Sequence, residues 1–269
     1  MNLAVILPAA GFGRRYEAAG GLRHKLDEDL GGKPLLQRTV ETFTKFDDDD
    51  VTISEIIVAG PHDETALAEF RQQHADRLGL LSARIVRGGE THRWQTVAAA
   101  LGQVSETCTH VAIHDAARPC LSFELLRRVL RAARTHPAVI PGLSIHDTVK
   151  RTQETGETVG GDDPVAAILG ESAAAKQPLR IVRETPDREG LVLVQTPQVF
   201  RLELLRRAYA QKDLTGTDDA SLVERLGERV VVVEGEPRNI KVTVPADLAL
   251  ARAIMGFREP EGRPAHKRF

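Results

Sequence analysis

Cysteine is nearly missing from this chain, which has only Cys108 and Cys120 among its 269 residues. Two cysteines are too few for a disulfide framework or a four-cysteine metal site, and a reducing compartment such as the cytoplasm suits them best. We expect both to be small buried apolar residues. The nine histidines do not show the spacing of metal ligands.

Aromatic residues and excess charge are also scarce. Aromatic residues make up 4% of the chain, too few for the stacking platforms of proteins that bind single-stranded nucleic acid. The formal net charge is only -2, from 36 lysines and arginines against 38 acidic residues. This balance disfavours binding to nucleic acid or to an anionic membrane. The apolar run at residues 3–7 is too short for a signal peptide or a membrane span, so we expect a cytoplasmic protein.

Short β-branched apolar runs do alternate with longer helical segments, as is typical of βαβ units around a largely parallel sheet. Helices are predicted where Leu36, Val40 and Phe43 form a helical stripe, after an N-cap at Ser122, and from Pro245. The fold class expected is α/β. The strands are expected near residues 3–7, 56–58, 83–86, 110–113, 139–141, 191–194 and 230–233.

Two segments interrupt this alternation. Residues 47–50 are four consecutive aspartates, which we expect to form a solvated loop because like charges at this density resist packing. Residues from about 152 to 177 are rich in glycine, alanine and acidic residues and lack a strong strand pattern, so we interpret them as an insertion or arm. We predict one domain over residues 1–256, with an arm at about 148–190, and a flexible tail at 257–269.

The first predicted strand runs into a loop of small residues at 8–15 that ends in Arg14 and Arg15. Because Gly11 and Gly13 have no side chains, backbone amides can point at phosphate oxygens, and the two arginines can supply charge-assisted hydrogen bonds. The loop lacks the third glycine of a dinucleotide fingerprint and the lysine ending of a P-loop. It predicts a polyphosphate site, with a plain tight turn as the alternative.

Two more segments favour phosphate chemistry. Lys25 lies on the next loop, where its charge would neutralise negative charge that develops at a phosphorus centre. Asp115 and Arg118 follow a buried strand, at the edge where ligands bind in open α/β sheets. Asp115 is suited to hold a divalent cation or to accept hydrogen bonds from hydroxyls, and Arg118 to bind a phosphate. The alternatives are a solvated lysine and an aspartate that caps its own turn.

Three further clusters combine hydroxyl or amide groups with a cation at the end of a strand. They comprise residues 147–151, residues 187–188 with 195–198, and residues 239–243. A polyol phosphate needs both, because its hydroxyls require directional partners and its phosphate requires positive charge.

Taken together, these segments resemble the 2-C-methyl-D-erythritol 4-phosphate cytidylyltransferase family over about residues 4–256. The resemblance implies a Rossmann-like nucleotidyltransferase fold with a mostly parallel twisted sheet and a projecting dimerisation arm, in a homodimer. It also implies that CTP and a divalent cation such as Mg²⁺ are used to make CDP-methylerythritol and pyrophosphate for isoprenoid synthesis. The matching stretches are PAAGFGRR (8–15), GGKPLL (31–36), HDAARP (114–119), DTVKR (147–151), TPQ (196–198), TD (217–218) and NIKVT (239–243).

The resemblance also assigns roles to individual residues. Arg15 and Lys25 match the groups that stabilise the transition state, and we predict that the catalytic cations are Arg15, Lys25, Arg188 and Lys241. Those matched to the CTP loops are Ala9, Ala10, Gly11, Phe12 and Gly13, with Gly88, Gly89, Glu90 and Thr96 around the base. Those matched to groups that hold the sugar-alcohol phosphate are Asp115, Arg118, Thr148, Thr196 and Thr217, together with Arg188 and Lys241. Asp115 is also the candidate metal ligand, and Thr148 and Arg188 match residues from the arm of a neighbouring subunit.

The chain departs from the family pattern around Lys25 and in the second glycine loop. His24 stands where the family usually has proline and Leu26 where it usually has glutamine, and the spacer from Arg15 is longer. Residues 88–96 contain one extra residue, and Trp94 is unusual there. The arm is also longer than usual.

Three other functions share part of this pattern or are excluded by it. A cytidylyltransferase for another polyol phosphate, such as ribitol 5-phosphate, would have similar loops. A nicotinamide-dependent dehydrogenase would need a Tyr-x-x-x-Lys pair, but Gly20 follows Tyr16 and Asp213 follows Tyr209 at that spacing. A nucleotide-binding regulator would not need both Arg15 and Lys25. Some related proteins carry a fused cyclase domain, and the short stretch after Gly256 predicts a monofunctional chain.

Overall fold

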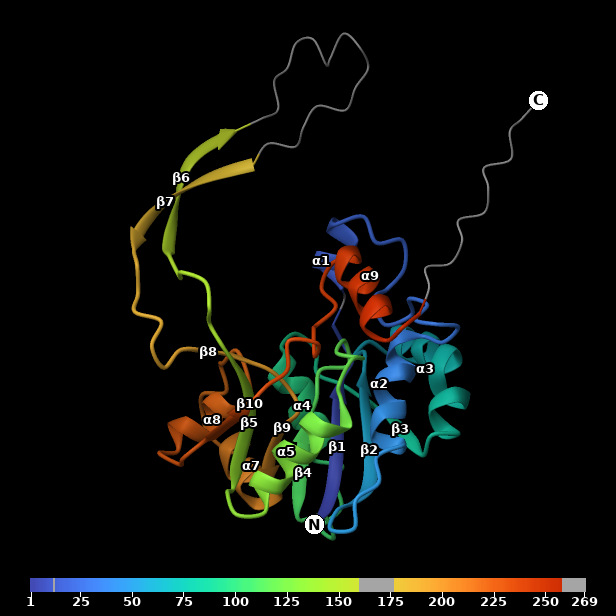
Figure 1. Ribbon diagram of the computed structural model, residues 1–269. Helices are drawn as coiled ribbons and strands as arrows, with labels where there is room; N and C mark the ends of the chain where they lie inside the picture. Colours follow the sequence, from blue (N-terminus) through green and yellow to red (C-terminus); the bar gives the residue numbers. More distant parts are fainter. Residues whose placement is uncertain (12, 160–176, 258–269) are drawn as a thin grey trace, which may run out of the picture. The chain divides into compact units, whose positions relative to one another are not determined.

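The computed structural model describes residues 1–11, 13–159 and 177–257, in two compact units (Figure 1). The larger unit combines the chain up to Leu143 with the chain from Val194 onward, and the smaller one is Ser144–Leu193. Among the described residues, no helix is both long enough and apolar enough to cross a membrane.

The larger unit is built on a mostly parallel sheet. Across the described residues the strands run in the order β10-β5-β9-β4-β1-β2-β3, and β8 pairs with β5 outside this order. Only β9 is antiparallel to its neighbours among the pairs along that order. The strands are β1 (Asn2–Pro8), β2 (Thr52–Gly60), β3 (Ala83–Arg87), β4 (His110–Ile113), β5 (Ala138–Ser144), β8 (Val192–Val194), β9 (Gln198–Arg201) and β10 (Val231–Glu234).

Every strand expected from the sequence is present. In the main sheet, β9 is a strand that the sequence does not predict. β9 has four residues, three of them buried, and its first residue is the polar Gln198. Gln198 is fully buried because its amide bonds to Asp218 and to the backbone of Asp219. A strand of four residues that begins with a hydrogen-bonded polar side chain has no apolar run long enough to predict it from the sequence.

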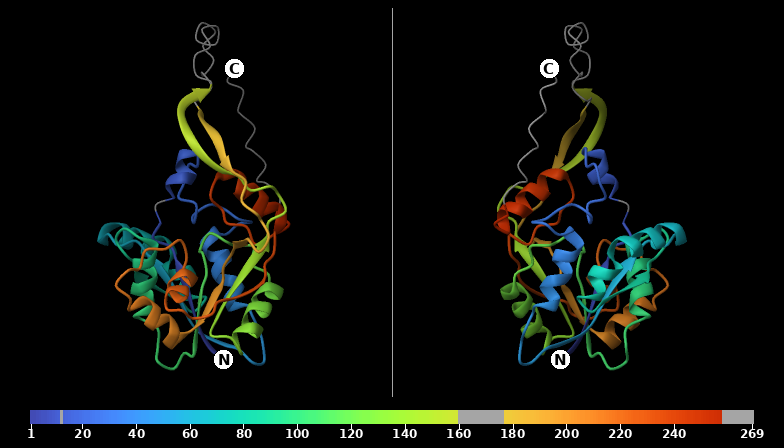
Figure 2. Two further views of the ribbon diagram at one scale, coloured as in Figure 1. Left: turned by 90° about the vertical axis from the view of Figure 1, so that its left-hand side faces the viewer. Right: turned by 90° about the vertical axis from the view of Figure 1, so that its right-hand side faces the viewer.

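Helices cover both faces of the sheet (Figure 2). Along β1, Leu3, Val5 and Leu7 belong to one apolar cluster and Ala4 and Ile6 to the other, so the strand is buried on both sides. The first cluster includes residues of α2, α5 and α9, and the second includes residues of α4, α7 and α8. The helices are α1 (Arg14–Ala18), α2 (Leu35–Thr44), α3 (Glu64–Gly79), α4 (Arg93–Leu101), α5 (Phe123–Ala133), α7 (Leu202–Tyr209), α8 (Ala220–Arg225) and α9 (Pro245–Ile254).

The local signals that predicted these helices are confirmed. Leu36, Val40 and Phe43 of α2 are all buried. The Ser122 side chain accepts a hydrogen bond from the backbone of Leu125 at the start of α5, and Pro245 opens α9. The aspartates at 47–50 form a mostly exposed loop, and both cysteines are free and buried.

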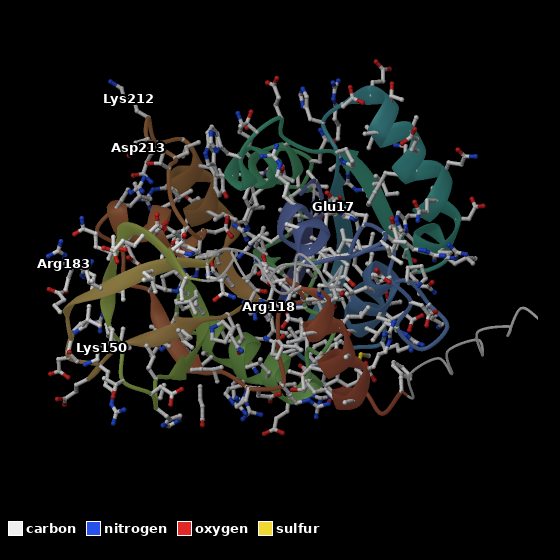
Figure 3. The ribbon with its side chains drawn as sticks, turned by 90° about the horizontal axis from the view of Figure 1, so that it is seen from above. Glu17, Arg118, Lys150, Arg183, Lys212 and Asp213 are labelled. Atoms are coloured by element: carbon white, nitrogen blue, oxygen red, sulfur yellow. The ribbon has the colours of Figure 1, made fainter. Side chains whose placement is uncertain are left out.

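The smaller unit contains an antiparallel pair, β6 (Arg151–Val159) and β7 (Gln177–Glu184). The sequence predicts an insertion or arm from about residue 152, but it predicts neither of these two strands. Every residue of both strands is exposed within this chain, so neither face imposes the apolar alternation by which a strand is recognised. Charged side chains of this unit, such as Lys150 and Arg183, reach the surface (Figure 3). The middle of the expected arm, 160–176, and positions 258–269 of the expected tail lie outside the described residues.

Candidate active site

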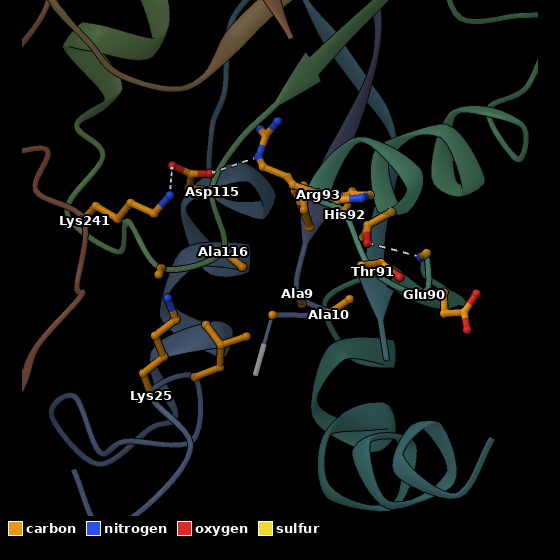
Figure 4. Close-up of a pocket in the computed structure, with 16 residues that line it drawn as sticks. Ala9, Ala10, Lys25, Glu90, Thr91, His92, Arg93, Asp115, Ala116 and Lys241 are labelled. Carbon is orange, nitrogen blue, oxygen red and sulfur yellow. Dashed lines mark hydrogen bonds and ion pairs between the residues drawn. The ribbon is translucent and has the colours of Figure 1, made fainter. Parts of the chain in front are cut away.

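The parallel strands bring several loops to one edge of the main sheet. Because β1, β2, β3 and β4 run in the same direction, the loops at their carboxyl ends share this edge. A pocket of about 200 Å³ opens there (Figure 4). The expected site residues that line it are Ala9, Ala10, Gly11, Lys25, Gly89, Glu90, Thr96, Asp115 and Lys241.

Asp115 is the buried acid of this pocket. Its Oδ2 lies 3.0 Å from Lys241 Nζ and 3.2 Å from Arg118 Nε, and its Oδ1 lies 3.7 Å from Arg93 Nε. Burial would raise the pKa of this carboxyl, but the three cations outweigh burial and hold its pKa well below the ordinary value. Asp115 is therefore a fixed negative charge surrounded by positive groups.

A buried hydrogen-bonded chain behind Asp115 fixes its backbone. The Asp115 amide donates to the Thr196 hydroxyl at 3.0 Å, and that hydroxyl lies 3.1 Å from Nδ1 of His114. The other ring nitrogen of His114 donates to the carbonyl of Arg118 at 3.0 Å. Burial lowers the pKa of His114 to about 4, so the ring is neutral and accepts from Thr196. Thr196 thus contacts the site from behind and does not line the pocket.

Arg93 is a pocket residue that was not selected from the sequence. It is the first residue of α4, and its Nη1 lies 2.7 Å from Oδ2 of the buried Asp219. The Tyr209 hydroxyl donates to the other oxygen of Asp219 at 2.6 Å. Burial would lower the pKa of Arg93, but Asp219 and Asp115 raise it above the ordinary value. Arg93 could have been predicted from helical spacing, because it lies one turn before Thr96, which was already expected at the site.

Lys25 lies on a separate loop. Its ammonium points toward Ala116 and the Asp115–Lys241 pair (Figure 4). Burial is the largest effect that lowers the pKa of Lys25, and the like charges of Lys241 and Arg15 lower it further, while Asp115 opposes them. Cations that repel one another therefore lie close together in this pocket. A polyanion that binds there would relieve their repulsion.

The second glycine loop packs too closely to accept side chains. A Cβ on Gly88 would lie 2.3 Å from the carbonyl oxygen of Gly60, and one on Gly89 would lie 2.2 Å from Cβ of Gln95. The Gly89 amide donates to the Thr96 hydroxyl at 3.2 Å. These contacts hold the backbone of this loop at the pocket wall.

The remaining expected site residues do not line the pocket. Arg15 is exposed on α1, Gly13 precedes that helix with φ +66°, and Gly88 lies behind Gly89. Arg118 lies 3.2 Å from Asp115 without lining the pocket, and Thr217 is exposed on the loop before α8. Phe12 lies outside the described residues. Thr148 and Arg188 are exposed residues of the smaller unit, where Arg188 donates to the carbonyl of His146.

Comparison with known proteins agrees with this geometry. The family model described as 2-C-methyl-D-erythritol 4-phosphate cytidylyltransferase matches residues 3–167 and 164–257. A protein of that name from Symbiobacterium thermophilum is 39% identical over 256 residues, which is 94% of this chain and 92% of the relative. One from Frankia casuarinae is 38% identical over 96% of this chain and 83% of its own length.

A solved structure has the same arrangement of elements. The crystal structure of 2-C-methyl-D-erythritol 4-phosphate cytidylyltransferase from Thermus thermophilus matches with a TM-score of 0.65 and 31% identity, over 94% of this chain and 98% of that one. The expected Rossmann-like nucleotidyltransferase fold is therefore confirmed. On both the sequence and the structure, the chain belongs to the 2-C-methyl-D-erythritol 4-phosphate cytidylyltransferase family.

Proposed function

We infer that this protein transfers the cytidylyl group of CTP to 2-C-methyl-D-erythritol 4-phosphate, releasing pyrophosphate in the synthesis of isoprenoid precursors. The observation that carries this function is the cationic pocket between two small-residue loops, in a chain that belongs to the family. Ala9, Ala10 and Gly11 leave room for backbone contact with a triphosphate, and Gly89 does the same on the facing loop.

The reaction is an in-line displacement. A phosphate oxygen of the sugar alcohol attacks the α-phosphorus of CTP, and the bond from that phosphorus to the β-phosphate oxygen breaks as pyrophosphate leaves with the electron pair. The attacking phosphate is already ionised, so no general base of unusual pKa is needed. The task of the protein is to bring two anions together and to neutralise charge in the transition state.

Lys25 and Lys241 are the proposed catalytic cations inside the pocket. Arg15, on α1, is the third, and its charge acts on Lys25. Burial, and after it the like charge of Lys241, lowers the pKa of Lys25. The repulsion between the two cations is relieved when the triphosphate enters, because each cation then gains an anionic partner. Lys241 is oriented by Asp115 at 3.0 Å. We add Arg93 to the proposed binding set, since it lines the same pocket and is held in place by Asp219.

Magnesium is proposed to arrive with the nucleotide. Among the described residues no group of three or more histidine, cysteine or acidic side chains is suited to hold a metal. Asp115 offers one carboxylate, whose Oδ1 lies 3.7 Å from Nε of Arg93. One carboxylate plus substrate phosphates is a usual Mg²⁺ environment, so the residues fit a metal carried by CTP, which neutralises phosphate charge when bound.

Activity is expected to vanish in EDTA and to return when magnesium is added back in excess. The physical reason is that the two anionic substrates repel each other unless phosphate charge is screened. Pyrophosphate release is the measurement, with zinc-free and calcium-free magnesium as the rescue. Full activity in metal-free buffer would contradict the proposal.

A homodimer is proposed in which the arm contributes to the neighbouring active site. Support comes from apolar side chains of the smaller unit that are exposed in the single chain, including Val159, Leu179, Ile181 and Val182. Such a group of exposed apolar residues is typical of a protein interface. Thr148 and Arg188, in the same unit, are the proposed contributions to the partner's site. A cytoplasmic location is also proposed, in keeping with two free cysteines.

Substrate identity is tested by pyrophosphate release from CTP, ATP, GTP and UTP, each with methylerythritol phosphate and with ribitol 5-phosphate. We expect turnover with CTP and methylerythritol phosphate to exceed every other pair by at least about tenfold, the discrimination that a few directed hydrogen bonds supply. Preference for ribitol 5-phosphate would reassign the second substrate. Absence of turnover with every pair would refute the transferase function.

A further inference from the structure

Lys25 is held in a tight turn that is anchored on its core side. The Asp27 amide donates to the carbonyl of His24 at 2.9 Å, which closes the turn. The side chain of Leu26 is buried in the core, and Asp27 lies 2.8 Å from the buried ring of His74 on α3. These contacts fix the turn relative to the sheet, but none of them reaches the glycine loop at the other side of the pocket.

The His24 ring supplies that missing connection. Its Nε2 donates to the carbonyl of Gly11 at 2.8 Å, and its Nδ1 accepts from the Leu26 amide at 3.4 Å. The ring also packs on Gly13, where an added Cβ would lie 3.3 Å from Cδ2 of His24. A single neutral imidazole with its proton on Nε2 makes both hydrogen bonds. Gly11 and Lys25, which both line the pocket, are thereby joined through one side chain.

We propose that His24 is a positioning residue that sets the distance between Lys25 and the phosphate-binding loop. The proposal rests on the transferase function argued above. A lysine side chain is long and flexible, so its backbone must be placed well for its charge to reach the reacting phosphorus. Because His24 precedes Lys25 directly, the hydrogen bond to Gly11 fixes the two walls of the pocket as one unit.

The two hydrogen bonds of His24 can be removed separately. The bond to Leu26 is local, two residues ahead, and an asparagine side chain makes the same kind of turn. The bond to Gly11 needs the longer reach and the donor at the Nε2 position, which a glutamine amide provides. Asparagine therefore keeps the local turn and loses the connection, whereas glutamine keeps the connection.

His24→Ala is expected to lower kcat about tenfold or more, since small misplacements of a catalytic group are costly, while the Kd for CTP changes by less than about twofold. His24→Gln is expected to recover most of kcat, and His24→Asn to behave like His24→Ala. His136→Ala, at an exposed histidine after α5, is the matched control and should retain wild-type kcat. Calorimetry measures Kd, and thermal unfolding checks that each variant is folded.

A double-mutant cycle decides whether His24 acts through Lys25. In a Lys25→Met background, His24→Ala is expected to change the residual rate by less than about twofold, because the side chain that it positions is gone. Additive effects, or recovery by asparagine and not by glutamine, would overturn the proposal and leave His24 a local turn residue. An unchanged kcat in His24→Ala would overturn it as well. Inactivity of the wild-type protein would instead refute the transferase function itself.

Discussion

Lys25→Met should lower kcat for CTP turnover by about 10²- to 10³-fold, the usual cost of losing one group that stabilises transition-state charge. The Kd for CTP should change far less. In the proposed ground-state complex, Lys241, Arg93, magnesium and backbone amides share the triphosphate charge, so the loss of one cation is spread over many contacts. During displacement, negative charge grows on the oxygens around the α-phosphorus, where the contribution of Lys25 is greatest.

The measurement pairs steady-state pyrophosphate release with calorimetric titration of CTP, both with magnesium present. Lys212→Met is a matched control, because Lys212 is an exposed lysine that does not line the pocket. Its kcat should equal that of the wild type. If CTP affinity collapses in parallel with the rate of Lys25→Met, Lys25 is a binding residue, and if the rate barely moves it has no catalytic role.

Mixing two inactive variants should restore activity if the arm serves the neighbouring subunit. Arg188→Ala and Lys25→Ala homodimers are each expected to be nearly inactive. In a mixed dimer, one site combines the intact core of the Arg188→Ala chain with the intact arm of the Lys25→Ala chain. The other site carries both defects. The mixed dimer should therefore recover about half of the wild-type activity per dimer.

Differently tagged chains, co-expressed and purified through both tags, provide the mixed dimer for this experiment. Arg183→Ala is the matched control, because Arg183 belongs to the same smaller unit and bonds to Gln153 within it at 2.6 Å. Its homodimer should be active, and mixing it with Lys25→Ala should give about half of wild-type activity. If mixing Arg188→Ala with Lys25→Ala restores nothing, each active site is built within one chain.

The elements that the sequence predicts are those in which burial produces a run or a periodic stripe of apolar residues. β4 was placed at its observed bounds because four residues in a row face the core or its edge, and α5 because Ser122 caps an apolar stripe. β6 and β7 escaped detection because all of their residues are exposed, and no described part of the chain buries either face.

The sequence predicts candidate site residues that belong to a recognisable motif. It does not predict those that are distinguished only by a partner far away in the sequence. Asp115 and Lys241 stand in recognisable segments and meet at 3.0 Å. Arg93 was overlooked because its partner Asp219 lies far along the chain, and one arginine after a glycine loop is not distinctive. His24 was noticed as an unusual residue, but its bond to Gly11 depends on how two loops fold together.

The position of β9 has a consequence for how the chain folds. β4 and β5 do not pair with each other, because β9 lies between them and bonds to both. During synthesis the sheet therefore stays open at its centre until residues 198–201 have emerged, after the whole of the smaller unit. When β9 pairs with β4 and β5, it joins strands that are separated along the chain by the smaller unit. The entropy cost of closing such a loop rises by only about 0.6 kcal/mol for each doubling of its length. The length of the arm can accordingly vary between relatives while the stability of the sheet changes little.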